Sequence, residues 1–268
     1  MTQELVDAWC RDIEQRRLVM EAHDAYKNWE QMMAVVCERS PVQILCLGIG
    51  SASVPAARDQ WALLQDMRQH ISKRCGTQPL VVVFDPQFDD MDVALVQRQQ
   101  AQLPQENNCG AYQLSEPTLV YMPHCPKELY EALLRANWKK EALDHIILCG
   151  NELSLYSTDM TAYPCLERIA PYTHAYPVPS LPASTAGALD ASMQVFFSPW
   201  QDMPDSKPAQ TWTYQPVRRK ARARRARSSL VREPMRMEED AFWSLPQARL
   251  EYGPEVLTTP VMNTTKIV

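Results

Sequence analysis

The sequence predicts an α/β protein, a Rossmann-like three-layer sandwich in which helices cover both faces of a mostly parallel sheet, preceded by an N-terminal helical extension. Two observations predict this class: short apolar runs alternate with longer amphipathic stretches from Pro41 onward, and a polar or glycine-containing turn follows each strong run. The 268 residues, 46% of them hydrophobic, suffice for one sizeable core. We therefore expect three regions, at residues 1–40, 41–200 and 201–268.

The first region is predicted to be helical. Apolar residues such as Leu5, Trp9 and Ile13 recur at spacings typical of a helix, and neither glycine nor proline interrupts residues 2–40. We expect one or two helices here.

The second region alternates predicted strands with predicted helices. Strands are expected at residues 43–48, 80–84, 118–122 and 145–149, with a weaker candidate at 111–114 and two further strands at 173–178 and 193–197. Helices are expected at residues 54–72, 90–102 and 127–137. The domain is expected to close near Ser198.

The third region differs in composition from the rest. Prolines recur through residues 201–268 without sustained periodicity, which predicts a largely disordered tail. Residues 217–232 hold eight of the 27 lysines and arginines and no acidic residue. The rest of the chain therefore has a formal net charge of about −13. The negative charge of the rest of the chain repels the phosphates of nucleic acid, so any nucleic-acid contact would be made through this basic run. The run is typical of a nuclear-import signal, a solvated linker, or a contact for RNA or an anionic surface.

The sequence predicts a soluble cytoplasmic protein, with nuclear entry if the basic run is an import signal. No stretch approaches the roughly 18 uncharged apolar residues of a membrane span, and the acidic N-terminus is unlike a signal peptide, so no membrane contact is expected. The eight cysteines contain no pair with zinc-binding spacing. We expect free thiols and no bound metal.

Candidate site residues follow the predicted strands, because ligands of open parallel sheets bind beyond the carboxyl ends of the strands. Gly48 and Gly50 permit a tight strand-to-helix turn, Ser51 or Ser53 can cap the next helix, and that helix N-terminus would favour an anion. Ala52 and Ser53 stand where the methyltransferase and dinucleotide fingerprints require glycine. The turn is therefore either a small-ligand site or a feature of strand-to-helix geometry alone.

Asp85 and the pair His124 and Cys125 follow two further strands. Asp85 either accepts hydrogen bonds from a ribose or caps the turn at Pro86. Neighbouring residues on an extended segment point to opposite sides, so His124 and Cys125 are not expected to act on each other. A helix beginning near Pro126 would lower the Cys125 pKa, and Cys-Pro also occurs in haem-regulatory motifs. Three roles stay open for His124 and Cys125: a structural turn, ligand binding, or catalysis or ligation of a metal or haem.

Several ordered segments resemble one known family, the sensitivity-to-red-light-reduced family. They are the strand and loop at 44–51, the helix start at 57–64, the Asp-Pro-x-Phe-like segment at 84–88, and the Met-Pro-His-Cys signature at 122–125 within 118–125. Segments at 129–138, 147–151 and 188–197 continue in register. The departures are Asp59, where an aromatic residue is more usual, and Ala191, where threonine is common.

The resemblance implies a Rossmann-like domain and a regulatory protein. Members of the family are associated with circadian rhythm and light signalling, with haem biosynthesis and its regulation, and with cytoskeletal or stress phenotypes, and no shared reaction is settled. The ligand-binding candidates are Gly48, Gly50, Ser51, Arg58, Asp85, His124, Cys125 and Asn151.

Two functional hypotheses follow. The first is a regulatory module that binds a protein partner or a small anionic or nucleotide-like ligand. The second is a cryptic enzyme dependent on a nucleotide or S-adenosylmethionine, in which Asp85 anchors a ribose and His124 or Cys125 reacts. Catalytic residues are not assigned, and haem, a nucleotide and S-adenosylmethionine all stay open as ligands. A concave pocket where the glycine turn, Asp85 and His124 converge favours an enzyme, whereas mutual hydrogen bonds among these groups favour a scaffold.

Deleting residues 217–232 tests the import interpretation of the basic run. We expect a fluorescent fusion of the full chain to lose nuclear signal on deletion, because import receptors bind such clustered positive charge. The measurement is the nuclear-to-cytoplasmic intensity ratio in live cells. An unchanged ratio would contradict the import interpretation.

Overall fold

A computed structural model describes residues 2–153, 163–169, 173–184, 189 and 192–196 and confirms the Rossmann-like α/β layering. The strands are β1 (Gln43–Leu47), β2 (Leu80–Phe84), β3 (Thr118–Met122), β4 (Ile146–Gly150), β5 (Thr173–Pro177) and β6 (Ser192–Phe196). The helices are α1 (Thr2–Glu21), α2 (Tyr26–Glu38), α3 (Pro55–Cys75), α4 (Asp90–Arg98), α5 (Lys127–Ala136), α6 (Lys140–Asp144) and α7 (Pro164–Ile169). The expected tail at 201–268, with its basic run, lies outside the described residues.

The sheet has the strand order β2-β1-β3-β4-β6-β5. Neighbours among β1 to β4 are parallel, whereas β6 is antiparallel to both β4 and β5. The chain moves from β1 to one neighbour, β2, and then returns past β1 to β3. The carboxyl ends of β1 and β3 therefore flank the point where the strand order reverses, which is where ligands of doubly wound sheets bind.

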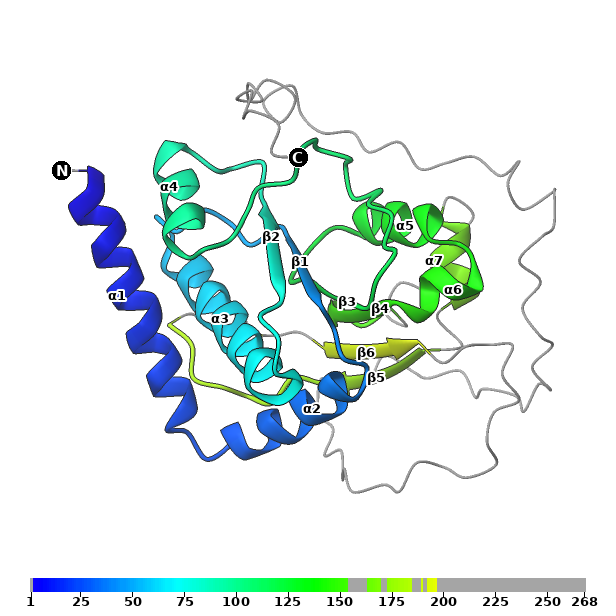
Figure 1. The fold of residues 1–268 in the computed structure, drawn as a ribbon, viewed down its shortest axis with the longest axis horizontal. Helices are drawn as coiled ribbons and strands as arrows, with labels where there is room; N and C mark the ends of the chain where they lie inside the picture. Colours follow the sequence, from blue (N-terminus) through cyan, green and yellow to red (C-terminus); the bar gives the residue numbers. More distant parts are fainter. Residues whose placement is uncertain (1, 154–162, 170–172, 185–188, 190–191, 197–268) are drawn as a thin grey trace, which may run out of the picture.

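Alternate side chains of each central strand enter two different core layers. Ile44 and Cys46 of β1 pack with α1 to α4, whereas Leu45 and Leu47 pack with α5 to α7. Figure 1 shows α1, α3 and α4 on one side of the sheet and α5, α6 and α7 on the other. The apolar strands are covered on both faces, as their continuous hydrophobic runs predict.

The N-terminal extension forms two helices that share the core of the sheet. Ile13 of α1 and Trp29 of α2 are 1% and 0% exposed and belong to the same buried cluster as Ile44. Asp66 of α3 accepts hydrogen bonds from the Tyr26 hydroxyl at 2.7 Å and from the Trp29 indole nitrogen at 2.5 Å. The core is thus continuous across the expected boundary at residues 40 and 41. Within the described ranges, no helix has the length and apolar character needed to span a membrane.

The weak strand candidate at 111–114 is wrong. This segment is irregular, because its backbone pairs with a side chain: Asn137 accepts from the Leu114 nitrogen at 2.8 Å and donates to the Tyr112 carbonyl at 2.7 Å. Asn137 also donates to the Leu133 carbonyl at 2.8 Å, which ties the segment to α5. The amide therefore replaces a strand partner.

The expected helix at 90–102 ends early, at Arg98. Gln100 adopts a left-handed backbone, and Gln102 then exchanges hydrogen bonds with β2, donating to Val81 and accepting from Val83 at 2.8 Å each. The edge of β2 thereby gains a backbone partner.

Replacing Asn137 with alanine tests its bridging role. We expect Asn137→Ala to lower the free energy of unfolding by about 1–3 kcal/mol, because three backbone groups lose this hydrogen-bond partner and two of those contacts are buried. The measurement is urea denaturation followed by circular dichroism. Asn28→Ala, at an exposed position of α2, serves as the control and should change stability by less than about 0.5 kcal/mol. Equal effects of the two substitutions would contradict the bridging role.

Candidate functional site

The turn after β1 is held by two buried carboxylates of the protein itself. The Gly50 nitrogen donates to Asp85 Oδ2 at 2.7 Å, and the Ala52 nitrogen donates to Asp92 Oδ1 at 2.8 Å. Asp85 and Asp92 are 5% and 0% exposed. Backbone N–H groups that receive phosphate in many related turns are therefore paired internally here.

Asp85 acts on the turn that follows β2 as well. Its Oδ1 accepts from the Gln87 nitrogen at 2.8 Å, so each carboxylate oxygen has a backbone donor. Burial raises the pKa of Asp85, and the hydrogen bonds from Gln87 and Gly50 offset part of that rise. These backbone hydrogen bonds are the ones expected if Asp85 caps the turn at Pro86.

The loop after β3 brings together three of the candidate residues. His124 has a left-handed backbone with φ of 57°, and its nitrogen donates to Asn151 Oδ1 at 3.1 Å. The Asn151 amide also donates to the Cys125 carbonyl at 3.0 Å. One asparagine after β4 thus fixes the loop after β3.

His124 and Cys125 have opposite environments. His124 is exposed, whereas Cys125 is 4% exposed and its thiol donates to the Leu47 carbonyl at 3.3 Å. Burial, with a smaller contribution from Asp85, raises the pKa of Cys125 to about 12. This direction is opposite to the lowering that was expected from the α5 N-terminus, because the thiol is buried.

Gly48 has no side chain, and Cys125 lies in the space that a side chain there would occupy. An added Cβ at Gly48 would lie 2.6 Å from the Cys125 sulfur, and the Gly48 φ of 73° also disfavours other residues. The first glycine of the turn is therefore required by close packing as well as by backbone geometry.

Tyr130 joins the ends of β3 and β4 and was not among the sequence candidates. Its hydroxyl donates to the Met122 carbonyl and accepts from the Asn151 nitrogen at 2.9 Å. Gly150 leaves room for this hydroxyl, since an added Cβ would lie 2.6 Å from it. Asp92 was missed too: the Asp89-x-x-Asp92 spacing indicates a capping box, which is observed, but does not indicate a contact with the glycine turn.

A cleft of about 500 Å³ lies at the switch point of the sheet, within the size range of small-molecule sites. Its lining comes from four segments: the glycine turn, the start of α3, the turn after β2 and the loop after β3. The lining residues are Gly48, Ile49, Gly50, Ser51, Ser53, Val54, Ala57, Gln60, Gln87, Asp89, Pro123 and His124.

Half of the sequence candidates line this cleft. Gly48, Gly50, Ser51 and His124 are among the lining residues, whereas Arg58, Asp85, Cys125 and Asn151 are not. Those four instead bind backbone groups of the surrounding loops.

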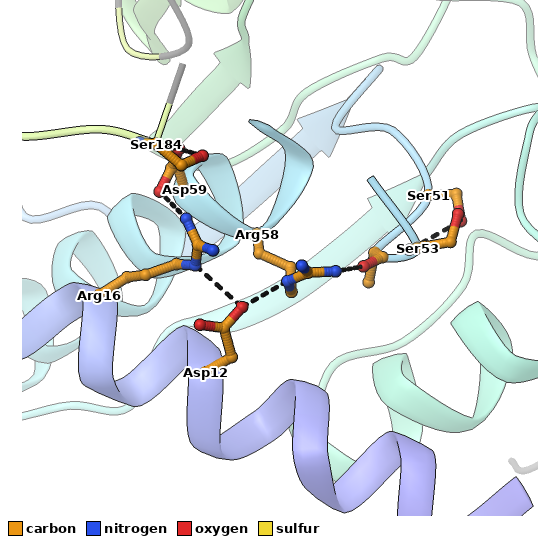
Figure 2. A network of polar contacts seen from close by, with 8 residues as sticks. Asp12, Arg16, Ser51, Ser53, Arg58, Asp59 and Ser184 are labelled. Carbon is orange, nitrogen blue, oxygen red and sulfur yellow. Dashed lines mark hydrogen bonds and ion pairs between the residues drawn. The ribbon is translucent and has the colours of Figure 1, made fainter. Parts of the chain in front are cut away.

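Arg58 connects the glycine turn to α1 (Figure 2). Its Nη1 donates to the Ala52 carbonyl and its Nε to Asp12, each at 2.5 Å. Arg16 also donates to Asp12, at 3.0 Å, and to Asp59 at 2.5 Å. The guanidinium of Arg58 is thus engaged by a carbonyl and a carboxylate of the protein.

Asp59, the departure from the family pattern, is 1% exposed and fully engaged. Besides Arg16, it binds the nitrogen and hydroxyl of Ser184 at 2.7 Å and 2.5 Å. The carboxylate therefore ties α3 both to α1 and to the segment before β6 (Figure 2).

The fold and cleft define a Rossmann-like protein with a candidate small-ligand site at its topological switch point. The sequence gives the family directly: the profile of the SRR1 domain matches residues 27–245, well over half of the chain. The chain belongs to the SRR1 domain family. The match is wider at both ends than the motif-bearing segments at 44–197.

Three curated relatives share part of this sequence. An SRR1-like protein of Mus musculus is 34% identical over 42% of this chain, and one of Drosophila melanogaster is 31% identical over 44%. The protein SENSITIVITY TO RED LIGHT REDUCED 1 of Arabidopsis thaliana is 27% identical over 49%. The alignments cover 45%, 41% and 47% of these proteins, so the chain spans less than half the length of each.

Substitution of Gly48 tests the close packing beneath the cleft. We expect Gly48→Ala to lower the free energy of unfolding by about 1–2 kcal/mol because of the left-handed backbone at this position. The clash with Cys125 should lower it by about 1–3 kcal/mol more. Gly76→Ala is the matched control, because Gly76 has φ of 70° and no atom near its added Cβ. Thermal or urea unfolding measures both.

The Cys125→Ala substitution completes a double-mutant cycle with Gly48→Ala. Removing the sulfur should restore the part of the loss that is due to the clash, giving a coupling free energy of about 1–3 kcal/mol. Additive effects of the two substitutions would refute the packing argument.

Proposed function

We propose that this protein is a regulatory module that binds a small, uncharged, nucleoside-like ligand in the cleft at the end of β1 and β3. The single observation that carries the proposal is the convergence of the glycine turn and His124 on one cleft of about 500 Å³ at the switch point of the sheet. The ligand would lie between the first turn of α3 and the loop after β3.

Binding without catalysis is favoured by the state of the reactive groups. The Cys125 thiol is buried with its pKa raised to about 12, so it is a poor nucleophile at neutral pH. Asp85 and Asn151 hold loop backbone rather than facing the cleft. Among the described lining residues, His124 alone supplies an imidazole.

The charge and hydrogen bonding of the cleft favour an uncharged ligand over a phosphate. Gly50, Ala52 and Ser53 direct their N–H groups to Asp85, Asp92 and the Ser51 hydroxyl. In the described part of the chain, the lining includes the carboxylate of Asp89 and no lysine or arginine. The lining presents serine hydroxyls, glutamine side chains and one imidazole, which are groups that recognise hydroxyl and amide groups.

A signalling role is favoured over a metabolic one by the family. The Arabidopsis relative is named for sensitivity to red light, and we extend to this chain a regulatory role in a light- or clock-dependent response. Haem binding through Cys125 is not part of the proposal, because that thiol is 4% exposed and donates to the Leu47 carbonyl.

A thermal-shift comparison tests the cleft. We expect adenosine or another nucleoside to stabilise the full chain by about 2.7 kcal/mol at 100 times its dissociation constant, and ATP to stabilise it less. S-adenosylmethionine, a dinucleotide and haem complete the set of probes.

His124→Asn removes the imidazole while keeping a residue that tolerates a left-handed backbone. The shift should shrink in this variant and persist in His23→Ala, which alters an exposed histidine outside the cleft. Stabilisation by ATP but not by nucleosides, or no stabilisation by any probe, would refute the proposed ligand class. Conversion of the bound compound, followed by mass spectrometry, would establish an enzyme instead.

A further inference from the structure

Two half-buried cysteines meet where α2 and α3 end, away from the cleft. Cys37 lies in the last turn of α2, Cys75 is the last residue of α3, and Figure 1 shows α2 beside that end of α3. The Cys75 sulfur lies 3.8 Å from the Cys37 carbonyl oxygen, so the Cys75 side chain contacts the residue that carries the other thiol. The Cys37 thiol also approaches the His70 carbonyl at 3.9 Å.

We infer that Cys37 and Cys75 form an oxidation site, at which hydrogen peroxide converts the two thiols into a disulfide that joins α2 to α3. The site is independent of the proposed ligand cleft. The 3.8 Å contact of the Cys75 sulfur with the Cys37 backbone brings the two residues together, and such proximity is the first requirement of a disulfide.

Selectivity for this pair follows from exposure. Cys46, Cys149 and Cys165 are 0% exposed and Cys125 is 4% exposed, so peroxide has little access to them. Cys10 and Cys109 are half-buried like the pair, but their sulfurs contact the Gln99 side chain and the Asn107 carbonyl rather than another cysteine. Among the described cysteines, the α2–α3 pair thus combines access with a resolving partner.

The reaction balances with peroxide as the oxidant. The first sulfur, as thiolate, attacks a peroxide oxygen, the O–O bond breaks, and a sulfenic acid and one water form. The second sulfur then attacks the sulfenic sulfur, the S–O bond breaks, and a second water leaves as the S–S bond forms. The two thiols lose two electrons and two protons, which reduce the peroxide to two waters.

The disulfide would close a loop that contains β1 and all of α3. Such a crosslink stabilises mainly by restricting the unfolded chain, so oxidation should raise the unfolding temperature. The crosslinked helix is the one whose opposite end lines the cleft with Val54, Ala57 and Gln60.

Peptide mapping of the full chain tests the site. Trypsin separates the two cysteines into the peptides 28–39 and 75–98, each of which contains a single cysteine. After treatment of the folded protein with hydrogen peroxide and alkylation of remaining thiols, we expect one crosslinked species, lighter than the two peptides together by two hydrogen atoms. It should disappear on reduction with dithiothreitol, and the unfolding temperature should fall back with it.

Cys109→Ser is the control and should retain both the crosslinked species and the rise in unfolding temperature. Cys37→Ser and Cys75→Ser should each lose both the crosslinked species and the rise in unfolding temperature. Absence of the 28–39 to 75–98 crosslink in the wild-type chain would overturn the proposal whatever the stability of the variants. A crosslink that forms only after denaturation would overturn it as well.

Discussion

The site depends on one constraint: the turn after β1 must present its backbone N–H groups to carboxylates of the same chain. Asp85 after β2 and Asp92 in α4 accept those hydrogen bonds, so the turn, the second strand and the fourth helix hold one another. Related turns leave such donors for phosphate. In this chain the carboxylates of Asp85 and Asp92 take the place of a bound anion, and burial raises the pKa of both acids. The cleft is consequently a preformed surface of hydroxyl, amide and imidazole groups.

The sequence allowed the central strands to be predicted because each is an apolar run bounded by turn residues, and runs buried on both faces carry little ambiguity. Candidate residues were placed correctly at the strand ends for the same reason. The turn at Tyr112 could not be predicted, because its backbone partner, Asn137, lies beyond the next strand and helix. The contact of Tyr130 with Asn151 likewise depends on tertiary packing and leaves no local pattern.

Charged side chains near the cleft illustrate a second limit of sequence reasoning. Arg58 stands one turn into α3, where an arginine commonly meets a ligand anion, yet Asp12 of α1 engages it. No periodicity in either helix identifies this partner, because the pairing spans 46 residues. The N-terminal helices are thus both part of the core and a second layer of support for the glycine turn, through Arg58 and the Ala52 carbonyl.

The order of strands in the sheet differs from their order in the chain, and this has a consequence for synthesis. Strand β4 is buried along its whole length, but its outer partner is β6, which the ribosome makes about forty residues later, at roughly 5–20 residues per second. During those seconds the nascent chain carries an apolar strand with an open edge, a template for pairing with other chains. The length of segment 151–191 therefore sets the duration of that exposure. A longer segment would increase the need of the nascent chain for chaperones.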